Sequence, residues 1–135
     1  NYLKIESENM YYENFNLIED EKASNFFALK LLNDSSCAAA KINFPQGTYS
    51  GLASIFSPAS NHSRFFICVD DDSYLVYGSE PPVDKYELTT RSVVSFTLEK
   101  PKTVTVRLQQ NDSKGFQNGG QTGMNIDYIL FRKAD

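Results

Sequence analysis

Residues 92–108 read SVVSFTLEKPKTVTVRL, and this stretch decides the fold class. Two runs in which apolar and polar residues alternate, 92–98 and 103–108, flank a short polar connection that contains Pro101. Successive side chains of a strand point to opposite faces, so each run predicts a β-strand with one buried face. In the second run the apolar positions share one face: Val104, Val106 and Leu108. The connection, 99–102, predicts a hairpin turn between the two strands.

Similar short runs recur along the chain, separated by Gly, Pro, Asn and Asp. They predict strands at residues 41–44, 48–56, 64–69, 74–77 and 125–132. Residues 23–32 fit a helix or a strand that ends in a turn. A long polar stretch, 111–123, holds four of the seven glycines and predicts a loop. Regularly spaced strands with turns between them indicate an all-β protein, an antiparallel β-sandwich or jelly roll.

The length and charge limit the number of domains and the kind of partner. A chain of 135 residues fits one domain, residues 1–135. The formal net charge is -4 and basic residues do not cluster, which argues against nucleic acid and anionic membrane as partners. The chain starts without Met or a signal peptide, so we expect a module excised from a larger multidomain protein.

Acidic residues occur in strand-like settings near both ends of the chain. Alternation would place Glu6 and Glu8 on one face of an extended strand, and Asp127 lies within an apolar run. If the terminal strands are neighbours, three carboxylates converge and need a counter-ion, and hard oxygen ligands suit Ca²⁺. On these residues alone, the alternative is that Glu6 and Glu8 form a solvated strand face and Asp127 is a lone edge carboxylate.

Other reactive residues give weaker indications. Cys37 and Cys68 fit two buried free thiols, although a disulfide stays open. The single histidine, His62, fits a solvated loop, so a zinc site is disfavoured. The run Asp70-Asp71-Asp72 is typical of a solvated hairpin turn, with a second cation site or an acceptor of sugar hydroxyls as alternatives.

Four local patterns occur in the order found in one group of families. They are Ile5-Glu6-Ser7-Glu8-Asn9, Phe44-Pro45-Gln46-Gly47-Thr48-Tyr49, the alternating segment 93–108 and Asn125-Ile126-Asp127-Tyr128-Ile129. Together they resemble the carbohydrate-binding modules of families 6, 35 and 36, which are small β-sandwich jelly rolls. The chain departs from the pattern in three ways: Ser7 replaces Ala between the glutamates, Lys100-Pro101-Lys102 replaces a glycine turn, and Trp is absent.

The resemblance implies both a cation site and a sugar site. Glu6, Glu8 and Asp127 would bind a structural Ca²⁺ that ties the first strand to the last. A sugar site in the loops at one end of the sandwich would use aromatic side chains for the flat faces of sugar rings and an amide for the hydroxyls. The residues at the matching positions are Asn125, Tyr86 and either Phe26 or Phe27. Tyr11, Tyr12, Gln117 and Asn118 lie in polar or loop segments and are secondary candidates.

These features predict non-catalytic binding of an oligosaccharide or polysaccharide. The module would direct a covalently linked catalytic domain, a glycoside hydrolase or polysaccharide lyase, to its substrate in a secreted or cell-surface protein. The alternative is a protein-interaction or adhesion sandwich with a structural calcium ion. An independent enzyme is disfavoured, because the glutamates are adjacent on one face and Asp127 is embedded in an apolar strand. No nucleophile motif or nucleotide-binding pattern appears either.

Overall fold

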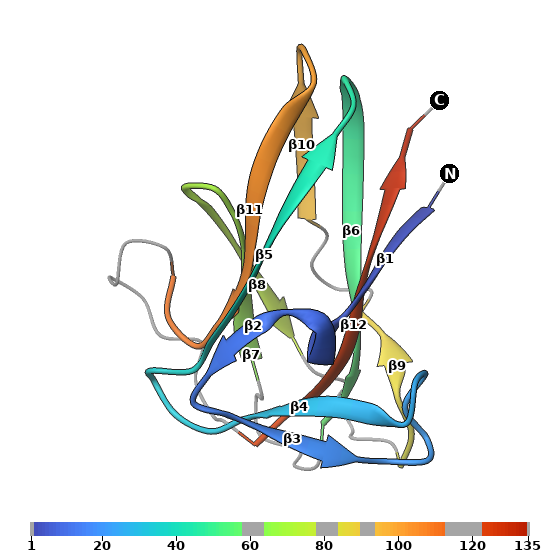
Figure 1. Ribbon diagram of the computed structural model, residues 1–135, viewed down its shortest axis with the longest axis vertical. Helices are drawn as coiled ribbons and strands as arrows, with labels where there is room; N and C mark the ends of the chain where they lie inside the picture. The colour runs from blue at the N-terminus through green and yellow to red at the C-terminus, as the bar shows by residue number, and fades with distance from the viewer. Residues whose placement is uncertain (1, 58–63, 78–83, 90–93, 113–122, 135) are drawn as a thin grey trace.

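A computed structural model describes residues 2–57, 64–77, 84–89, 94–112 and 123–134. Within these ranges the chain forms two antiparallel sheets and one short 3₁₀ turn, η1 (Ser7–Asn9) (Figure 1). The predicted all-β sandwich is therefore confirmed. No helix in the described part is long and apolar enough to cross a membrane. Asn118, Gln117 and His62 lie outside the described residues.

The first sheet has the order β10-β6-β12-β4-β3, with β1 also on β12 and β9 on β6. Its strands are β1 (Tyr2–Glu6), β3 (Phe15–Glu19), β4 (Phe27–Leu31), β6 (Gly47–Phe56), β9 (Glu87–Leu88), β10 (Val94–Leu98) and β12 (Asn125–Lys133). The second sheet has the order β2-β5-β11-β7-β8. Its strands are β2 (Tyr11–Glu13), β5 (Cys37–Phe44), β7 (Arg64–Val69), β8 (Asp72–Tyr77) and β11 (Lys102–Gln109).

The hairpin predicted for residues 92–108 is wrong, although its strands exist. β10 pairs with β6 in the first sheet, whereas β11 pairs with β5 and β7 in the second. The connection through Pro101 therefore passes from one sheet to the other, as does the connection from β5 to β6 (Figure 1). Alternation correctly predicts that Val104, Val106 and Leu108 are fully buried. It cannot say which strand lies alongside, because two sheets that face each other both bury one face.

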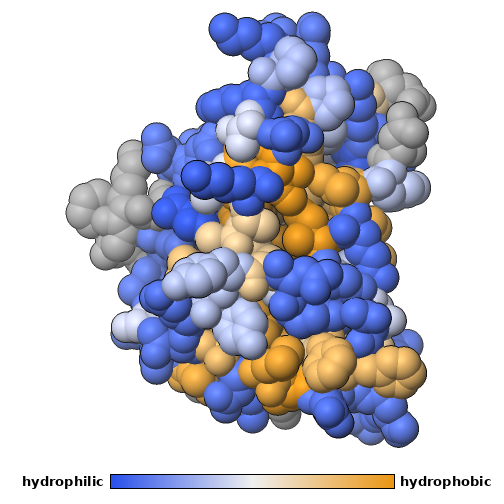
Figure 2. All heavy atoms as spheres, viewed as in Figure 1, coloured by the Kyte–Doolittle hydropathy of each residue, from blue (hydrophilic) through white to orange (hydrophobic). Residues whose placement is uncertain are grey.

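Aromatic rings fill the core beneath these two crossing connections. Phe44 contacts Tyr49 and Phe131, with ring centroids 4.9 and 5.3 Å apart, and Phe96 stacks on Tyr49 at 5.3 Å. Figure 2 shows apolar surface between polar side chains on this side of the molecule. A hollow there is lined by residues that include Tyr2 and the core rings of Phe44, Tyr49 and Phe131.

Two regions resolve alternatives that the sequence left open. Residues 23–32 form no helix: a turn ends at Phe26, and β4 begins at Phe27. Cys37 and Cys68 are free thiols, as favoured, and lie on β5 and β7 with β11 between them. Burial raises the pKa of both thiols. A raised pKa lowers the fraction of reactive thiolate at neutral pH.

Candidate functional site

Two strands share one edge of β12, and Asp127 lies where they meet. β4 pairs with Asn125 and Ile126, and β1 pairs with residues 128–132. On the other edge of β12 the register with β6 shifts between Ile126 and Tyr128, so Asp127 is the extra residue of a β-bulge. A β-bulge changes the direction in which the side chain of its extra residue points. Asp127 is consequently held at the junction with only 2% of its surface exposed.

The first strand brings two glutamates to the same junction, but not as an extended strand. β1 ends at Glu6, and Glu8 lies in the η1 turn, so the prediction that both belong to one strand face is wrong. Ser7 explains the change: it is fully buried, and its hydroxyl donates to the carbonyl of Ile126 at 2.6 Å. This bond fastens the turn to β12. The serine that departs from the family pattern thus has a structural role.

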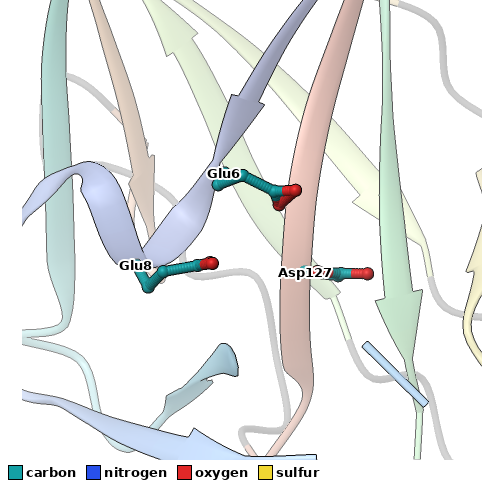
Figure 3. A group of neighbouring side chains, drawn as sticks. All are labelled: Glu6, Glu8 and Asp127. Carbon is teal, nitrogen blue, oxygen red and sulfur yellow. The ribbon is translucent and has the colours of Figure 1, made fainter. Parts of the chain in front are cut away.

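The three carboxylates lie close together, as the sequence predicted. Figure 3 shows their side chains as neighbours around β12. One oxygen from each of Glu6, Glu8 and Asp127 lies within 4.8 Å of the other two. Oxygens bound to one Ca²⁺ at 2.3–2.6 Å are at most about 5 Å apart, so this spacing fits a shared ion. The group therefore has the size and the ligand type of a calcium site.

The turn formed by residues 20–26 covers the cluster and occupies one oxygen of each carboxylate. The Ser24 backbone N–H donates to Asp127 Oδ2 at 2.8 Å, and the Ser24 hydroxyl donates to Glu6 Oε1. Asn25 Nδ2 donates to Glu8 Oε2 at 3.1 Å. The second oxygen of each group, Glu6 Oε2, Glu8 Oε1 and Asp127 Oδ1, is buried and accepts no hydrogen bond. Buried polar atoms without a partner are rare and costly, and three in one place fit a bound cation.

The electrostatics of the cluster lead to the same conclusion. Burial raises the pKa of Asp127 to about 6; the Ser24 N–H opposes this, and the negative charges of Glu6 and Glu8 add to it. Lys4 Nζ lies 3.3 Å from Glu6 Oε1 and supplies one positive charge from a half-exposed position. The three carboxylates therefore carry more negative charge than their neighbours balance.

A second set of predicted residues meets beside this cluster, at the end of the sandwich. Asn125 lies opposite Phe56 of β6, and the Phe56 ring contacts Tyr86 with centroids 5.7 Å apart. The Tyr86 hydroxyl donates to Asp20 Oδ2 at 2.9 Å. Burial and this bond raise the pKa of Tyr86 well above its usual range, and the Asn125 side chain partly opposes them. Asn125 Oδ1 is buried and accepts no hydrogen bond.

The two phenylalanines lie at the end of the same turn. Phe26 is 66% exposed and has a φ of 63°, a left-handed conformation that bulky residues seldom adopt. Phe27 begins β4 and is half-buried. Together with Glu19, Asp20 and Glu21 they line a shallow hollow. The backbone N–H of Asp20 donates to the Phe26 carbonyl at 2.9 Å, which connects the hollow to Tyr86 through Asp20.

The structure thus places Phe26 and Phe27 on one hollow. Asp20 connects this hollow to Tyr86, which in turn contacts the Asn125 side chain. The fifth predicted sugar-binding residue, Asn118, is not described. Sequence reasoning missed Phe56, Asp20, Ser24 and Asn25. Phe56 ended an alternating run and looked like an ordinary strand residue. Ser24 and Asn25 lie in the segment that fitted either a helix or a strand, and Asp20 lies just before it. No local pattern shows that such residues contact side chains between 17 and 103 positions away.

No family model matches the chain, and no curated protein matches it. Solved structures do match. Three carbohydrate-binding modules cover most or all of the chain and are themselves covered almost completely. A family 35 module from Clostridium thermocellum has a TM-score of 0.73 and 12% identity over 99% of each chain. The C-terminal family 6 module of a marine laminarinase from Zobellia galactanivorans has a TM-score of 0.65 and 23% identity over 98% of this chain and 100% of that one.

A family 36 module of a multidomain xylanase, from the hindgut metagenome of Trinervitermes trinervoides, has a TM-score of 0.65 and 16% identity over 100% of this chain and 99% of that one. Other matches are longer. An exo-β-1,3-galactanase from Phanerochaete chrysosporium has a TM-score of 0.76 and 12% identity over 97% of this chain, which spans only 29% of the galactanase. The resemblance to families 6, 35 and 36 is confirmed at the level of the fold.

Proposed function

We propose that this chain is a non-catalytic carbohydrate-binding module that binds an oligosaccharide or polysaccharide. The observation that carries the proposal is the exposed Phe26 ring, held in a left-handed conformation on the rim of a hollow. Such a conformation costs on the order of 1–3 kcal/mol and tends to persist at ligand sites. A fixed, exposed ring offers a flat apolar face of the kind on which a sugar ring packs. The fold shared with three carbohydrate-binding modules supports this interpretation.

The polar part of the site would come from Asn125 and Asp20. Asn125 Oδ1 has no partner but is buried, so it would accept a bond from a sugar hydroxyl only after its side chain turns toward the hollow. Asp20 Oδ1 accepts the Lys22 backbone N–H, and Oδ2 accepts the Tyr86 hydroxyl, so this carboxylate is held in one position. Tyr86 itself is half-buried, and we infer that it supports Asp20 rather than stacking on the sugar.

The residues at the carboxylate cluster fit a structural Ca²⁺. Glu6, Glu8 and Asp127 would hold the ion with the oxygens that lack partners. Its charge would relieve the repulsion among the three groups and tie β1 and η1 to β12. The same burial argues against an enzyme: glycosidase carboxyl pairs lie about 5–9.5 Å apart on opposite sides of a bound substrate. Here the free oxygens are enclosed by protein.

In the whole protein, the module would direct an attached catalytic domain to its substrate. Residues 1–135 form a single module in this proposal, linked to a glycoside hydrolase or polysaccharide lyase in a secreted or cell-surface protein. The matching modules of a laminarinase and a xylanase are parts of such enzymes. Tethering raises the effective concentration of the enzyme near its substrate without any new catalytic contact.

Affinity electrophoresis in gels that contain laminarin, xylan or β-1,3-galactan tests the proposal. We expect retarded migration in at least one gel and no release of sugar. Phe26→Ala should abolish the retardation, and Tyr2→Ala should leave it unchanged. Tyr2 is the matched control, because it is also 66% exposed but lies at the start of β1, away from the turn. Sugar release would indicate an enzyme, whereas normal migration in a wide polysaccharide panel would favour a protein-interaction or adhesion module.

A further inference from the structure

The turn of residues 20–26 lies between the carboxylate cluster and the aromatic hollow. On one side Ser24 and Asn25 donate hydrogen bonds to all three carboxylates. On the other side Asp20 and Phe26 line the hollow, and Asp20 accepts the Tyr86 hydroxyl. A single short segment therefore contacts both sites.

This turn is closed by its own hydrogen bonds. The Ala23 N–H donates to the Asp20 carbonyl at 3.0 Å, and the Phe26 N–H donates to the Ala23 carbonyl at 3.3 Å. The Asp20 N–H donates to the Phe26 carbonyl, and the Ala23 side chain within the turn is buried. Because these bonds connect its two ends, a shift at Ser24 must also move Asp20 and Phe26.

A cation in the cluster could not touch a sugar in the hollow. Asp127 is 2% exposed, and the three unpartnered oxygens are buried beneath the turn. Any effect of the ion on sugar binding must therefore pass through protein atoms. The hydrogen bonds of Ser24 and Asn25 are the direct route, since they end on the same carboxylates that would bind the ion.

We propose that a cation held by Glu6, Glu8 and Asp127 fixes the 20–26 turn through Ser24 and Asn25, and so positions Phe26 and Asp20 for the glycan. Ser24 and Asn25 are positioning residues that orient the carboxylates and touch neither the ion nor the sugar. This inference rests on the proposed function. Because coupling between two sites is reciprocal, the glycan must also tighten binding of the cation.

The absence of Trp from the chain allows a direct test that needs no glycan. Phe26→Trp places a single fluorescent reporter at the end of the turn. Ca²⁺ is titrated into EDTA-stripped protein by calorimetry, and the anisotropy of the reporter is followed under the same conditions. We expect the anisotropy to rise with the calorimetric midpoint. Calcium binding with unchanged anisotropy would overturn the coupling alone, and no calcium binding would overturn the cation site as well.

The positioning residues are tested by Ser24→Ala and Asn25→Ala, with Ser35→Ala as the matched control in an exposed turn. Removing a partner that orients a metal ligand typically weakens metal binding about 10–100-fold. We expect a loss of at least tenfold in Ca²⁺ affinity for each variant and none for Ser35→Ala. Unchanged affinity in both variants would overturn their assigned role.

A third experiment tests glycan binding. It compares the retardation of the wild-type protein in laminarin, xylan and β-1,3-galactan gels that contain either excess Ca²⁺ or EDTA. We expect weaker retardation in EDTA, at a temperature where circular dichroism shows the stripped protein still folded. Equal retardation in both buffers would refute the coupling and leave carbohydrate binding intact. If no gel retards the protein in either buffer, the proposed function fails, whereas the Phe26→Trp titration still decides whether the ion fixes the turn.

Discussion

Two groups of three carboxylates in this molecule behave in opposite ways. Asp70, Asp71 and Asp72 are consecutive, whereas Glu6, Glu8 and Asp127 come from opposite ends of the chain. The consecutive group lies at the turn between β7 and β8, and Asp70 has a φ of 52°. Asp70 Oδ1 accepts the Thr105 N–H at 2.9 Å, and Lys102 Nζ lies 3.0 Å from Oδ2. The sequence neighbours thus form the hairpin turn that the sequence favoured, with a carboxylate that is well supplied with partners.

The pKa values express the same difference. Burial opposes ionisation of Asp70, but the Thr105 N–H, Lys102 and Arg107 outweigh it, so the pKa of Asp70 is lowered. At Asp127 burial and two negative neighbours outweigh one backbone donor, and the pKa is raised to about 6. Closeness in sequence therefore does not make a cation site. What matters is that negative oxygens are enclosed together without enough donors.

The largest predicted effect concerns the enclosed group. Calcium at about 1,000 times its dissociation constant should stabilise the folded state by about 4 kcal/mol. For a domain of this size the melting temperature should rise on the order of 10 °C above that of EDTA-stripped protein. Differential scanning calorimetry measures the shift. Equal melting temperatures with calcium and with EDTA would mean that the enclosed group binds no stabilising ion and does not differ from the consecutive group in this respect.

The second prediction concerns the pH dependence of the cation-free protein. The pKa of Asp127 is higher in the folded state, about 6, than the usual value near 3.9 in an unfolded chain. The contribution of Asp127 to the stability of the folded state is therefore fully present below about pH 4 and is lost as the pH rises through 6. We expect a loss of roughly 2 kcal/mol between pH 4 and pH 7, measured by urea unfolding in EDTA. If the free energy of unfolding of wild type instead rises between pH 4 and pH 7, relative to that of Asp127→Asn, Asp127 is not a buried carboxylate whose charge lacks compensation.

Asp127→Asn should separate the destabilising effect of the negative charge from the role of the carboxylate as a calcium ligand. In EDTA at pH 7 we expect the variant to be about 1–2 kcal/mol more stable than wild type, because a neutral amide need not be ionised in the cluster. Its side-chain oxygen can still accept the Ser24 N–H. In excess calcium the order of stability should reverse, because a ligand is lost. A variant less stable than wild type in both buffers would indicate that the carboxylate is needed for packing alone.

The smallest effect is expected at the consecutive group. Asp70→Asn removes the ion pair with Lys102 but keeps an oxygen for the Thr105 N–H. Partly exposed ion pairs contribute under about 1 kcal/mol, so the variant should lose less than that and respond to calcium as wild type does. A calcium response that disappears in Asp70→Asn would mean that the stabilising ion binds at the β7–β8 turn instead.

Much of the fold could be predicted from local patterns. Alternation identified the buried faces of β11 and β6, and the final run became β12. The order of strands could not be predicted, and the supposed hairpin through Pro101 joins two different sheets. Alternation depends on which face is buried, whereas pairing depends on contacts between distant segments.

The sequence by itself determined which carboxylates would meet if the terminal strands were neighbours, because Glu6, Glu8 and Asp127 lie in strand-like settings near the two ends of the chain. Only the tertiary structure decided how they meet. The bulge at Asp127, the η1 turn fastened by Ser7 and the 20–26 turn that covers the cluster all depend on contacts between distant segments. The physical reason is that burial and hydrogen-bond partners, which set the charge balance of each group, belong to the folded chain and not to a residue's neighbours in sequence.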